Sequence, residues 1–186
     1  MKRHLFLFVF SLVLLLSAGC NRMDSFDPDY PIVDWYPVNL IVTVQDSQGN
    51  DLLNPEHANN YFEGASLVFR GKQYDVQGIE DDPYAAVSTK YYMPHMRGLR
   101  LAHDTLYFSK DQKELCHFLV FGELDGAEDM DEDIELQWRD GTREIIHYHC
   151  SDHKIEKKSG GEWEITCKRE WMLNGEVASN PFRLVK

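Results

Sequence analysis

The densest group of side chains capable of chemistry lies between residues 147 and 153, where three histidines surround a cysteine. Imidazole nitrogen and thiolate sulfur are ligands that suit zinc and copper. Residues two apart on a strand point to the same side, so His147 and His149 would form half of a site, with His153 as a further ligand. The sequence therefore supports the hypothesis of a zinc or copper site at these three histidines.

The hairpin expected at Asp140-Gly141 favours a simpler interpretation of the same residues. With a loop of even length, Ile134 would face His147, and Cys150 would point to the opposite side of the sheet. His147 would then lie beside apolar side chains as a histidine of the core or its rim, held by one hydrogen bond. On this register we expect a structural histidine rather than a metal ligand.

A second group is acidic and occupies residues 125–133. Asp129, Asp131 and Asp133 place hard oxygen ligands at alternate positions, as in the opening of a calcium-binding loop. An EF-hand needs glycine where this sequence has Ile134. Calcium would relieve the repulsion among the carboxylates, but a solvated acidic loop explains the same composition. Beyond calcium or zinc at these two groups, the sequence indicates no cofactor.

The thiols form a third candidate group. Cys150 and Cys167 flank the turn residues Ser159-Gly160-Gly161 on two expected strands. A disulfide needs Cα atoms about 4.4–6.8 Å apart, which directly opposed residues satisfy, whereas a turn centred on Gly160-Gly161 offsets the two cysteines. The bridged and the unbridged states both stay open. Cys116, in an apolar segment, is expected to be a buried free thiol.

Signature motifs of enzymes are missing from the sequence. It contains no G-x-S-x-G elbow, no phosphate-binding loop, no H-E-x-x-H and no dinucleotide fingerprint. A carboxylate pair for glycoside hydrolysis has no fixed spacing along a chain, so such a pair is not excluded. A hydrolase with a hidden carboxylate pair or a histidine–metal site is therefore the alternative to a non-catalytic binding protein.

The elements that must position these groups are short strands joined by tight turns. Residues 38–44 alternate between apolar and polar, which is typical of a strand with one buried side. Residues 115–121 are nearly all apolar, which predicts a central strand buried on both faces. Further strands are predicted at 65–69, 72–77, 106–109, 134–139, 143–150, 163–173 and 182–185. Residues 78–104 are expected to form a long loop, and no segment predicts a long helix, so the fold class is an all-β sandwich.

The first twenty residues have the pattern of an exported and lipid-modified protein. Lys2 and Arg3 precede the apolar run 5–16, which is shorter than the roughly twenty residues of a spanning helix. Ser17-Ala18-Gly19-Cys20 then resembles the lipobox of bacterial lipoproteins, in which the preceding segment is removed and the cysteine is acylated. The resemblance implies a signal peptide at 1–19, a lipidated tether at 20–30 and a β domain at 31–186. It also implies an outer-membrane anchor at Cys20, with the cell surface and the periplasmic face both open.

Charge restricts the partners of the mature protein. The 186-residue sequence has a net charge of −12, and removal of the leader, which carries Lys2 and Arg3, makes it more acidic. Such a chain repels phosphate backbones and anionic headgroups. No nucleic-acid partner is therefore expected, and membrane attachment is expected only through the lipid on Cys20.

Three short blocks extend the resemblance to the mature chain. They are residues 121–126 (FGELDG), 136–142 (LQWRDGT) and 171–175 (WMLNG), and they are similar to an uncharacterised family of Bacteroidetes-type lipoproteins. That family implies an immunoglobulin-like antiparallel sandwich of about seven to nine strands on a lipid anchor, and it supplies no catalytic residues. We therefore expect a binding or accessory module for a protein or glycan partner of the cell envelope.

Overall fold

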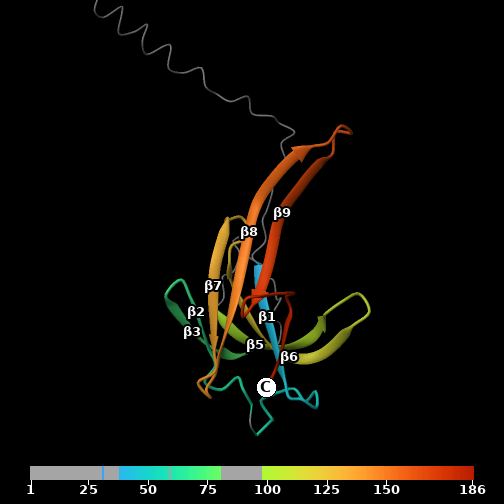
Figure 1. The fold of residues 1–186 in the computed structure, drawn as a ribbon. Helices are drawn as coiled ribbons and strands as arrows, with labels where there is room; N and C mark the ends of the chain where they lie inside the picture. The colour runs from blue at the N-terminus through green and yellow to red at the C-terminus, as the bar shows by residue number, and fades with distance from the viewer. Residues whose placement is uncertain (1–30, 32–37, 59, 81–97) are drawn as a thin grey trace, which may run out of the picture. The chain divides into compact units, whose positions relative to one another are not determined.

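The computed structural model describes residues 31, 38–58, 60–80 and 98–186 (Figure 1). The chain divides by its contacts into two units, Met1–Asp34 and Trp35–Lys186, and the described strands all belong to the second. The expected signal peptide, the tether and Cys20 lie outside the described residues. In the described part of the chain, no helix is long and apolar enough to cross a membrane.

The regular structure of the described residues consists of β-strands, as predicted, and it contains eleven of them rather than seven to nine. The strands are β1 (Val38–Gln45), β2 (Ser66–Phe69), β3 (Lys72–Asp75), β4 (Gln77–Glu80), β5 (Leu99–Tyr107), β6 (Lys113–Leu124), β7 (Met130–Gln137), β8 (Arg143–Lys157), β9 (Trp163–Leu173), β10 (Glu176–Ala178) and β11 (Phe182–Val185). They form a five-stranded sheet in the order β11-β1-β6-β5-β4 and a six-stranded sheet in the order β10-β9-β8-β7-β2-β3.

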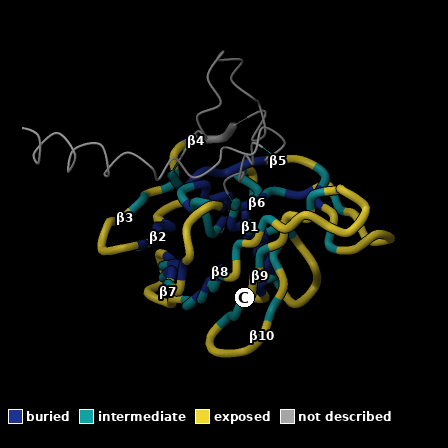
Figure 2. Tube along the Cα trace, turned by 90° about the horizontal axis from the view of Figure 1, so that it is seen from above, coloured by how far each residue is buried: buried dark blue, intermediate teal, exposed yellow. Residues whose placement is uncertain are grey.

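The two sheets share one hydrophobic core. β6 lies between β1 and β5, and residues 118–121 are buried on both of its faces, as an apolar central strand requires. The ring of Phe121 meets the rings of Phe69 and Tyr74, from β2 and β3, edge to face at centroid distances of 5.7 and 5.0 Å. Figure 2 shows the buried segments gathered where the two sheets face each other and the exposed turns around them. The arrangement is that of a β-sandwich.

The region expected to be a loop between 78 and 104 contains strand instead. β4 ends at Glu80 and β5 begins at Leu99, while residues 81–97 lie outside the described residues. β5 pairs with β6 over its whole length, from Leu99 to Tyr107, and with β4 at residues 100–102. Charged and polar residues between its apolar ones hide the alternation in the sequence, and pairing with β6 overrides that weak local signal.

The β7–β8 hairpin has a register that differs by one residue from the expected one. The N–H of Trp138 donates to the carbonyl of Thr142, and the N–H of Gly141 donates to the carbonyl of Trp138. Residues 139–141 therefore form the loop, with Gly141 at a φ of 81°, in the left-handed region. A three-residue loop of this kind is built from a type I turn and a left-handed glycine.

The odd loop length reverses the predicted positions of the β8 side chains. Ile134 pairs with Ile146, and His147 pairs with Asp133. A slip of one residue moves every side chain to the opposite face of a strand. His147 consequently lies on the outer face rather than in the core or at its rim, and Cys150 is buried in the core. The expectation for both residues was wrong.

The last residue of the chain holds the start of β8 through an ion pair. Lys186 Nζ lies 2.7 Å from Glu144 Oε1, and the two side chains are 13% and 15% exposed. Burial opposes ionisation of Glu144, but hydrogen bonds from Asn174 and Lys186 outweigh it and lower the pKa of this carboxyl. A buried pair of this kind ties β8 of one sheet to the end of β11 in the other.

The lowered pKa of Glu144 predicts a pH-dependent contribution to stability. When the pKa of a carboxyl is lower in the folded state, its contribution is present above the unfolded pKa and is lost as the pH falls through the folded pKa. We expect Glu144→Gln to destabilise the protein at neutral pH by about 1 kcal/mol and much less at about pH 3. Urea unfolding at both pH values measures this difference, and an equal loss at both would contradict the assignment.

Candidate functional site

The predicted histidines all lie on β8, but they occupy two different faces of it. His147 and His149 lie on the outer face, whereas Cys150 is fully buried on the inner one. Asp152 has a φ of 56°, and the pairing of β8 with β9 shifts register at this point, which marks a β-bulge. The extra residue reverses the alternation, and His153 therefore lies on the inner face beside Cys150.

The histidine set and the acidic set meet on the outer face. Asp133 and Asp131 of β7 stand directly opposite His147 and His149 of β8. His147 lies 2.9 Å from Asp133 Oδ1 and 3.1 Å from Asp131 Oδ1, and His149 lies 3.2 Å from the same oxygen of Asp131. Both carboxylates are at least 70% exposed, so each pair stabilises the fold by at most about 1 kcal/mol.

The remaining acidic residues between 125 and 133 are distributed rather than gathered. Glu128 and Glu132 bind the guanidinium of Arg70 at 3.2 and 2.9 Å. Asp129 lies 2.7 Å from Nδ1 of His153. Residues 130–133 of the predicted loop belong to strand β7, which sends alternate side chains to opposite faces. The structure thus places each of the three aspartates of the calcium hypothesis beside an imidazole and does not arrange them around a common point.

A cluster of two thiols and an imidazole lies on the inner face of β8 and β9. One ligand atom from each of Cys150, His153 and Cys167 lies within 4.8 Å of the other two, and Cys150 Sγ is 3.6 Å from His153 Nε2. Cys150 is buried, and the other two residues are half-buried. We call these three residues the thiol–imidazole cluster. Among the described residues, this group brings three potential metal ligands to one point, and the set of His147, His149 and His153 does not.

The described cysteines are free thiols. Cys150 pairs with Arg169, so Cys167 lies two residues further along β9 and not directly opposite Cys150. Diagonal neighbours in a sheet have a separation of about 7–8 Å, beyond the usual range of a disulfide. The direct opposition that a bridge requires is therefore absent. Cys116 is buried as expected, and burial raises the pKa of its thiol to about 12, so this thiol is inert.

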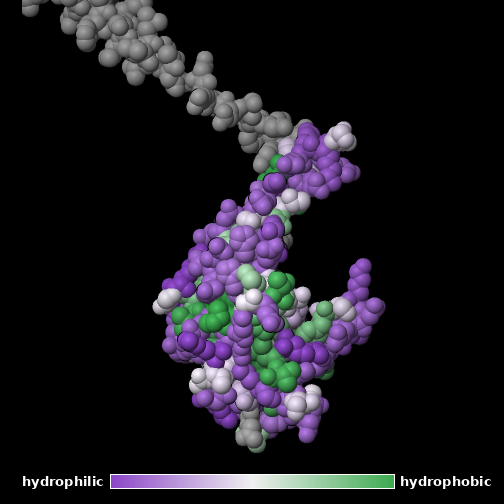
Figure 3. All heavy atoms as spheres, viewed as in Figure 1, coloured by the Kyte–Doolittle hydropathy of each residue, from purple (hydrophilic) through white to green (hydrophobic). Residues whose placement is uncertain are grey.

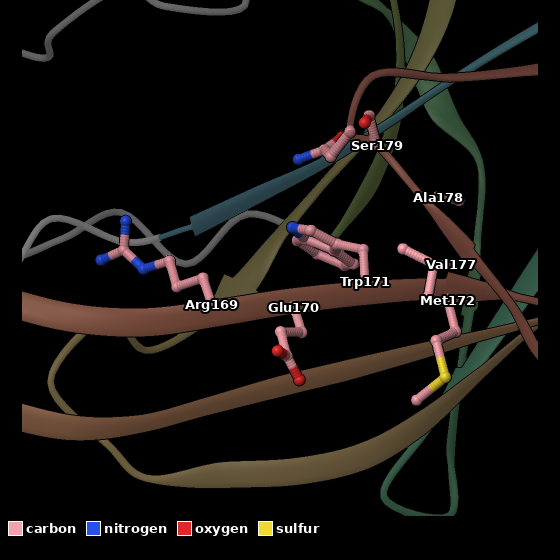
Figure 4. A pocket seen from close by; sticks show the side chains of 8 residues that line it. Arg169, Glu170, Trp171, Met172, Val177, Ala178 and Ser179 are labelled. Carbon is pink, nitrogen blue, oxygen red and sulfur yellow. The ribbon is translucent and has the colours of Figure 1, made fainter.

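A groove of about 470 Å³ lies where β9 meets the chain that crosses from β10 to β11 (Figure 4). It is lined by Arg169, Glu170, Trp171, Met172, Val177, Ala178, Ser179 and Asn180. We call this the β9–β10 groove. An indole and a guanidinium point into it, the side chains of Glu170 and Met172 turn to the other face of β9, and none of the histidines lines it.

The indole of Trp171 is held in place by the core while it lines the β9–β10 groove. Its ring lies 4.3 Å from the ring of Tyr148 and 5.7 Å from that of Phe182, measured between centroids. Arg169 is two residues away on β9 and rises from the same face of the strand. The side chain of Asn180 anchors the crossing by donating to the carbonyl of Asn39 and accepting from the N–H of Ile41. The groove therefore has an aromatic surface held by core contacts, with the guanidinium of Arg169 beside it.

Sequence reasoning identified every member of the thiol–imidazole cluster but divided them between two hypotheses. The bulge that unites them depends on a positive φ at Asp152, which the residue type does not specify. The β9–β10 groove was missed, because it depends on how the chain crosses from one sheet to the other. The sequence indicated the groove only in that Arg169 and Trp171 are two apart on a predicted strand and therefore share one face.

Comparison with known proteins finds no matching family model, no matching characterised protein and no matching solved structure.

Proposed function

We propose that this chain is an outer-membrane lipoprotein, anchored by acyl chains on Cys20, whose β domain is a non-catalytic module that binds a glycan of the cell envelope. The proposal includes an immunoglobulin-like type for the sandwich and membership of a Bacteroidetes-type lipoprotein family. The anchor is supported by the basic start, the short apolar run and the small residues before Cys20. The binding role is supported by the β9–β10 groove, which is the observation that carries the proposal.

The lining of the β9–β10 groove suits a sugar. Its volume of about 470 Å³ falls within the usual range of about 300–1,000 Å³ for sites that hold small ligands. A sugar ring offers an apolar face to an aromatic side chain and hydroxyl groups to polar ones. Trp171 supplies the aromatic ring, the guanidinium of Arg169 supplies hydrogen-bond donors, and the hydroxyl of Ser179 can accept as well as donate (Figure 4). A protein partner would instead favour a broad, flat apolar patch.

The hydrolase alternative fits the described residues less well. Glycoside hydrolysis requires two carboxyl groups that face the same sugar, about 5–10 Å apart. The one acidic residue in the lining of the β9–β10 groove, Glu170, turns its carboxylate to the other face of β9, where it pairs with Lys168 (Figure 4). A second hollow, which contains Glu63 and Asp75, has a volume of about 240 Å³ and is smaller than the usual ligand site. The histidines of β8 line neither hollow.

The anchor makes a direct prediction about Cys20. A protein held by more than one acyl chain stays firmly in the membrane, and a protein that lacks acylation does not. We expect the wild-type protein in the membrane fraction of the producing bacterium and the Cys20→Ser variant outside it. Immunoblots of fractionated cells measure the distribution, and a Cys20→Ser variant that still sediments with membranes would contradict the anchor.

The groove makes a second prediction. If Arg169 donates hydrogen bonds to the ligand, Arg169→Ala should weaken binding of the best ligand in a panel of envelope glycans at least tenfold. Arg143→Ala is the matched control, because Arg143 is a β8 residue with a 68% exposed side chain and does not line the groove. Calorimetric titration of the three proteins measures the affinities. Equal losses in both variants, or no loss in Arg169→Ala, would place the ligand elsewhere.

A further inference from the structure

We propose that the thiol–imidazole cluster of Cys150, His153 and Cys167 is a zinc site, separate in role from the β9–β10 groove. Two sulfur ligands and one imidazole nitrogen form a donor set that zinc takes in tetrahedral coordination. On binding, the two thiol protons leave to solvent and the neutral imidazole supplies the lone pair of Nε2, without any change of oxidation state. Two thiolates then balance the charge of the ion.

The geometry of the cluster is close to that of a zinc site. Zinc–sulfur and zinc–nitrogen bonds of about 2.3 and 2.0–2.1 Å at a tetrahedral angle separate the two ligand atoms by about 3.6 Å. The distance from Cys150 Sγ to His153 Nε2 is 3.6 Å. The whole set lies within 4.8 Å, so adjustment of side-chain rotamers by about 1 Å completes it. In the metal-free protein the carbonyl oxygen of Gly126 also lies 2.9 Å from Nε2, a hydrogen bond that zinc would replace as Nε2 gives up its proton to solvent and binds the metal.

A carboxylate holds the histidine in the orientation that a metal requires. Asp129 Oδ1 lies 2.7 Å from Nδ1 of His153, which leaves Nε2 facing the thiols. Histidines that bind metals commonly donate their other ring N–H to a carboxylate, which fixes the tautomer and makes the ligating nitrogen more basic. Asp129 is therefore a positioning residue for His153 in this site.

A buried hydroxyl beside the cluster supports the same assignment. Tyr148 is 0% exposed, and among the described residues its hydroxyl has no hydrogen-bond partner. Cys150 lies two residues further along β8, and its side chain is buried on the same face as that of Tyr148. A neutral thiol is a weak acceptor, whereas a thiolate bound to zinc carries charge and accepts more strongly. Zinc binding would thus supply the acceptor that the hydroxyl of Tyr148 lacks.

The diagonal placement of the two cysteines favours a metal over a disulfide. Cys150 pairs with Arg169, and Cys167 lies two residues along β9. A disulfide requires Cα atoms about 4.4–6.8 Å apart. Diagonal neighbours are about 7–8 Å apart, so a disulfide would have to move the two strands closer together. A metal ion between the sulfur atoms adds two bonds of about 2.3 Å and spans the larger distance without moving the strands.

Zinc at this site would stabilise the part of β8 and β9 that extends beyond the rest of the sheet. Met130 pairs with Cys150 at the start of β7, so residues 151–168 of β8 and β9 continue beyond β7 as a two-stranded ribbon among the described residues (Figure 1). We call residues 151–168 the arm. Its surface is mostly hydrophilic in the face shown in Figure 3. An isolated two-stranded ribbon is only marginally stable in water, and zinc at Cys150, His153 and Cys167 would tie the arm to the sheet.

The test is a titration of the purified full-length mature protein with zinc, under reducing conditions and with a competing chelator. We expect one equivalent to bind, and we expect cobalt(II) in place of zinc to show the absorption bands of tetrahedral thiolate ligation. Cys167→Ser should weaken zinc binding at least 100-fold, and Asp129→Asn should weaken it about 10–100-fold. Because Cys150 is fully buried and its serine variant is expected to be poorly folded, the half-buried Cys167 carries the test.

Two matched variants control for general effects. His149→Gln removes a histidine from the outer face of the same strand, and Cys116→Ser removes a thiol from another part of the core. Both should bind zinc as tightly as wild type, and amide exchange in the arm should slow when zinc is added. Absence of zinc binding by the reduced protein, or binding that survives Cys167→Ser, would overturn the proposal. So would a Cys150–Cys167 disulfide in protein isolated from its own membrane.

Discussion

Phe121→Ala is expected to lower the free energy of unfolding by about 3–5 kcal/mol, the largest effect of the substitutions considered for this protein. Phe121 is 1% exposed and lies on the central strand β6 of the five-stranded sheet. Its ring packs edge to face against Phe69 and Tyr74 of the six-stranded sheet, so its removal opens a cavity between the sheets. Urea unfolding measures the loss.

Leu115→Ala is the matched control for Phe121. Leu115 lies on the same strand, and its side chain is 65% exposed. A substitution on an exposed face changes stability by only about 0.5 kcal/mol or less. Similar losses from the two variants would mean that burial between the sheets does not distinguish Phe121 from the exposed Leu115, and would contradict the shared core described above.

Tyr148→Phe is expected to stabilise the metal-free protein by about 1 kcal/mol and to weaken zinc binding at the same time. An unsatisfied buried hydroxyl costs about 1–3 kcal/mol, and phenylalanine removes it while keeping the ring that packs against Trp171. In the zinc-bound protein the hydroxyl would have the thiolate of Cys150 as its acceptor, so the same change removes a favourable contact. The two effects have opposite signs.

Denaturation in the presence of a chelator, followed by the zinc titration, separates the two effects of Tyr148→Phe. A purely structural tyrosine would give a variant that loses stability with and without zinc. A variant that is less stable in the chelator than wild type would therefore contradict the account of the orphan hydroxyl. Unchanged zinc affinity in Tyr148→Phe would remove Tyr148 from the description of the site.

The all-β class and most of the strands follow from local patterns in the sequence. The alternation in residues 38–44 and the apolar run at 115–121 both predicted strands, and both are strands in the structure. The two-sided burial predicted for 115–121 holds for residues 118–121, whereas Leu115 is exposed. Hairpins at Asp140-Gly141 and Asn174-Gly175 follow from turn residues that tolerate positive φ. In β5, by contrast, polar residues interrupt the alternation, and pairing with the neighbouring strand β6 decides the structure.

The candidate sites were less predictable, because one residue more or fewer in a loop or strand changes which side chains share a face. Whether the loop after Trp138 has two or three residues decides which face of β8 carries His147, and Asp-Gly is compatible with both. The bulge at Asp152 then reverses the faces again before His153. The sequence shows which residues are available for chemistry, and these two irregularities decide which of them meet.

The β9–β10 groove and the arm share strand β9, and the two proposed roles can be tested separately. Arg169 and Trp171 of β9 line the β9–β10 groove, and Cys167 of the same strand belongs to the thiol–imidazole cluster. Zinc at the cluster would stiffen β9 next to the groove without touching the ligand. The variants Arg169→Ala and Cys167→Ser therefore distinguish loss of glycan binding from loss of zinc binding.

The most direct test of the central claim is to locate the bound glycan by amide chemical shifts. The isotopically labelled mature protein would be titrated with the envelope glycan that binds best in the panel. The account predicts shifts concentrated at residues 169–172 and 177–180, which line the β9–β10 groove. Shifts centred on the smaller hollow at residues 62–66 and 73–76, or no shift with any glycan of the panel, would contradict it.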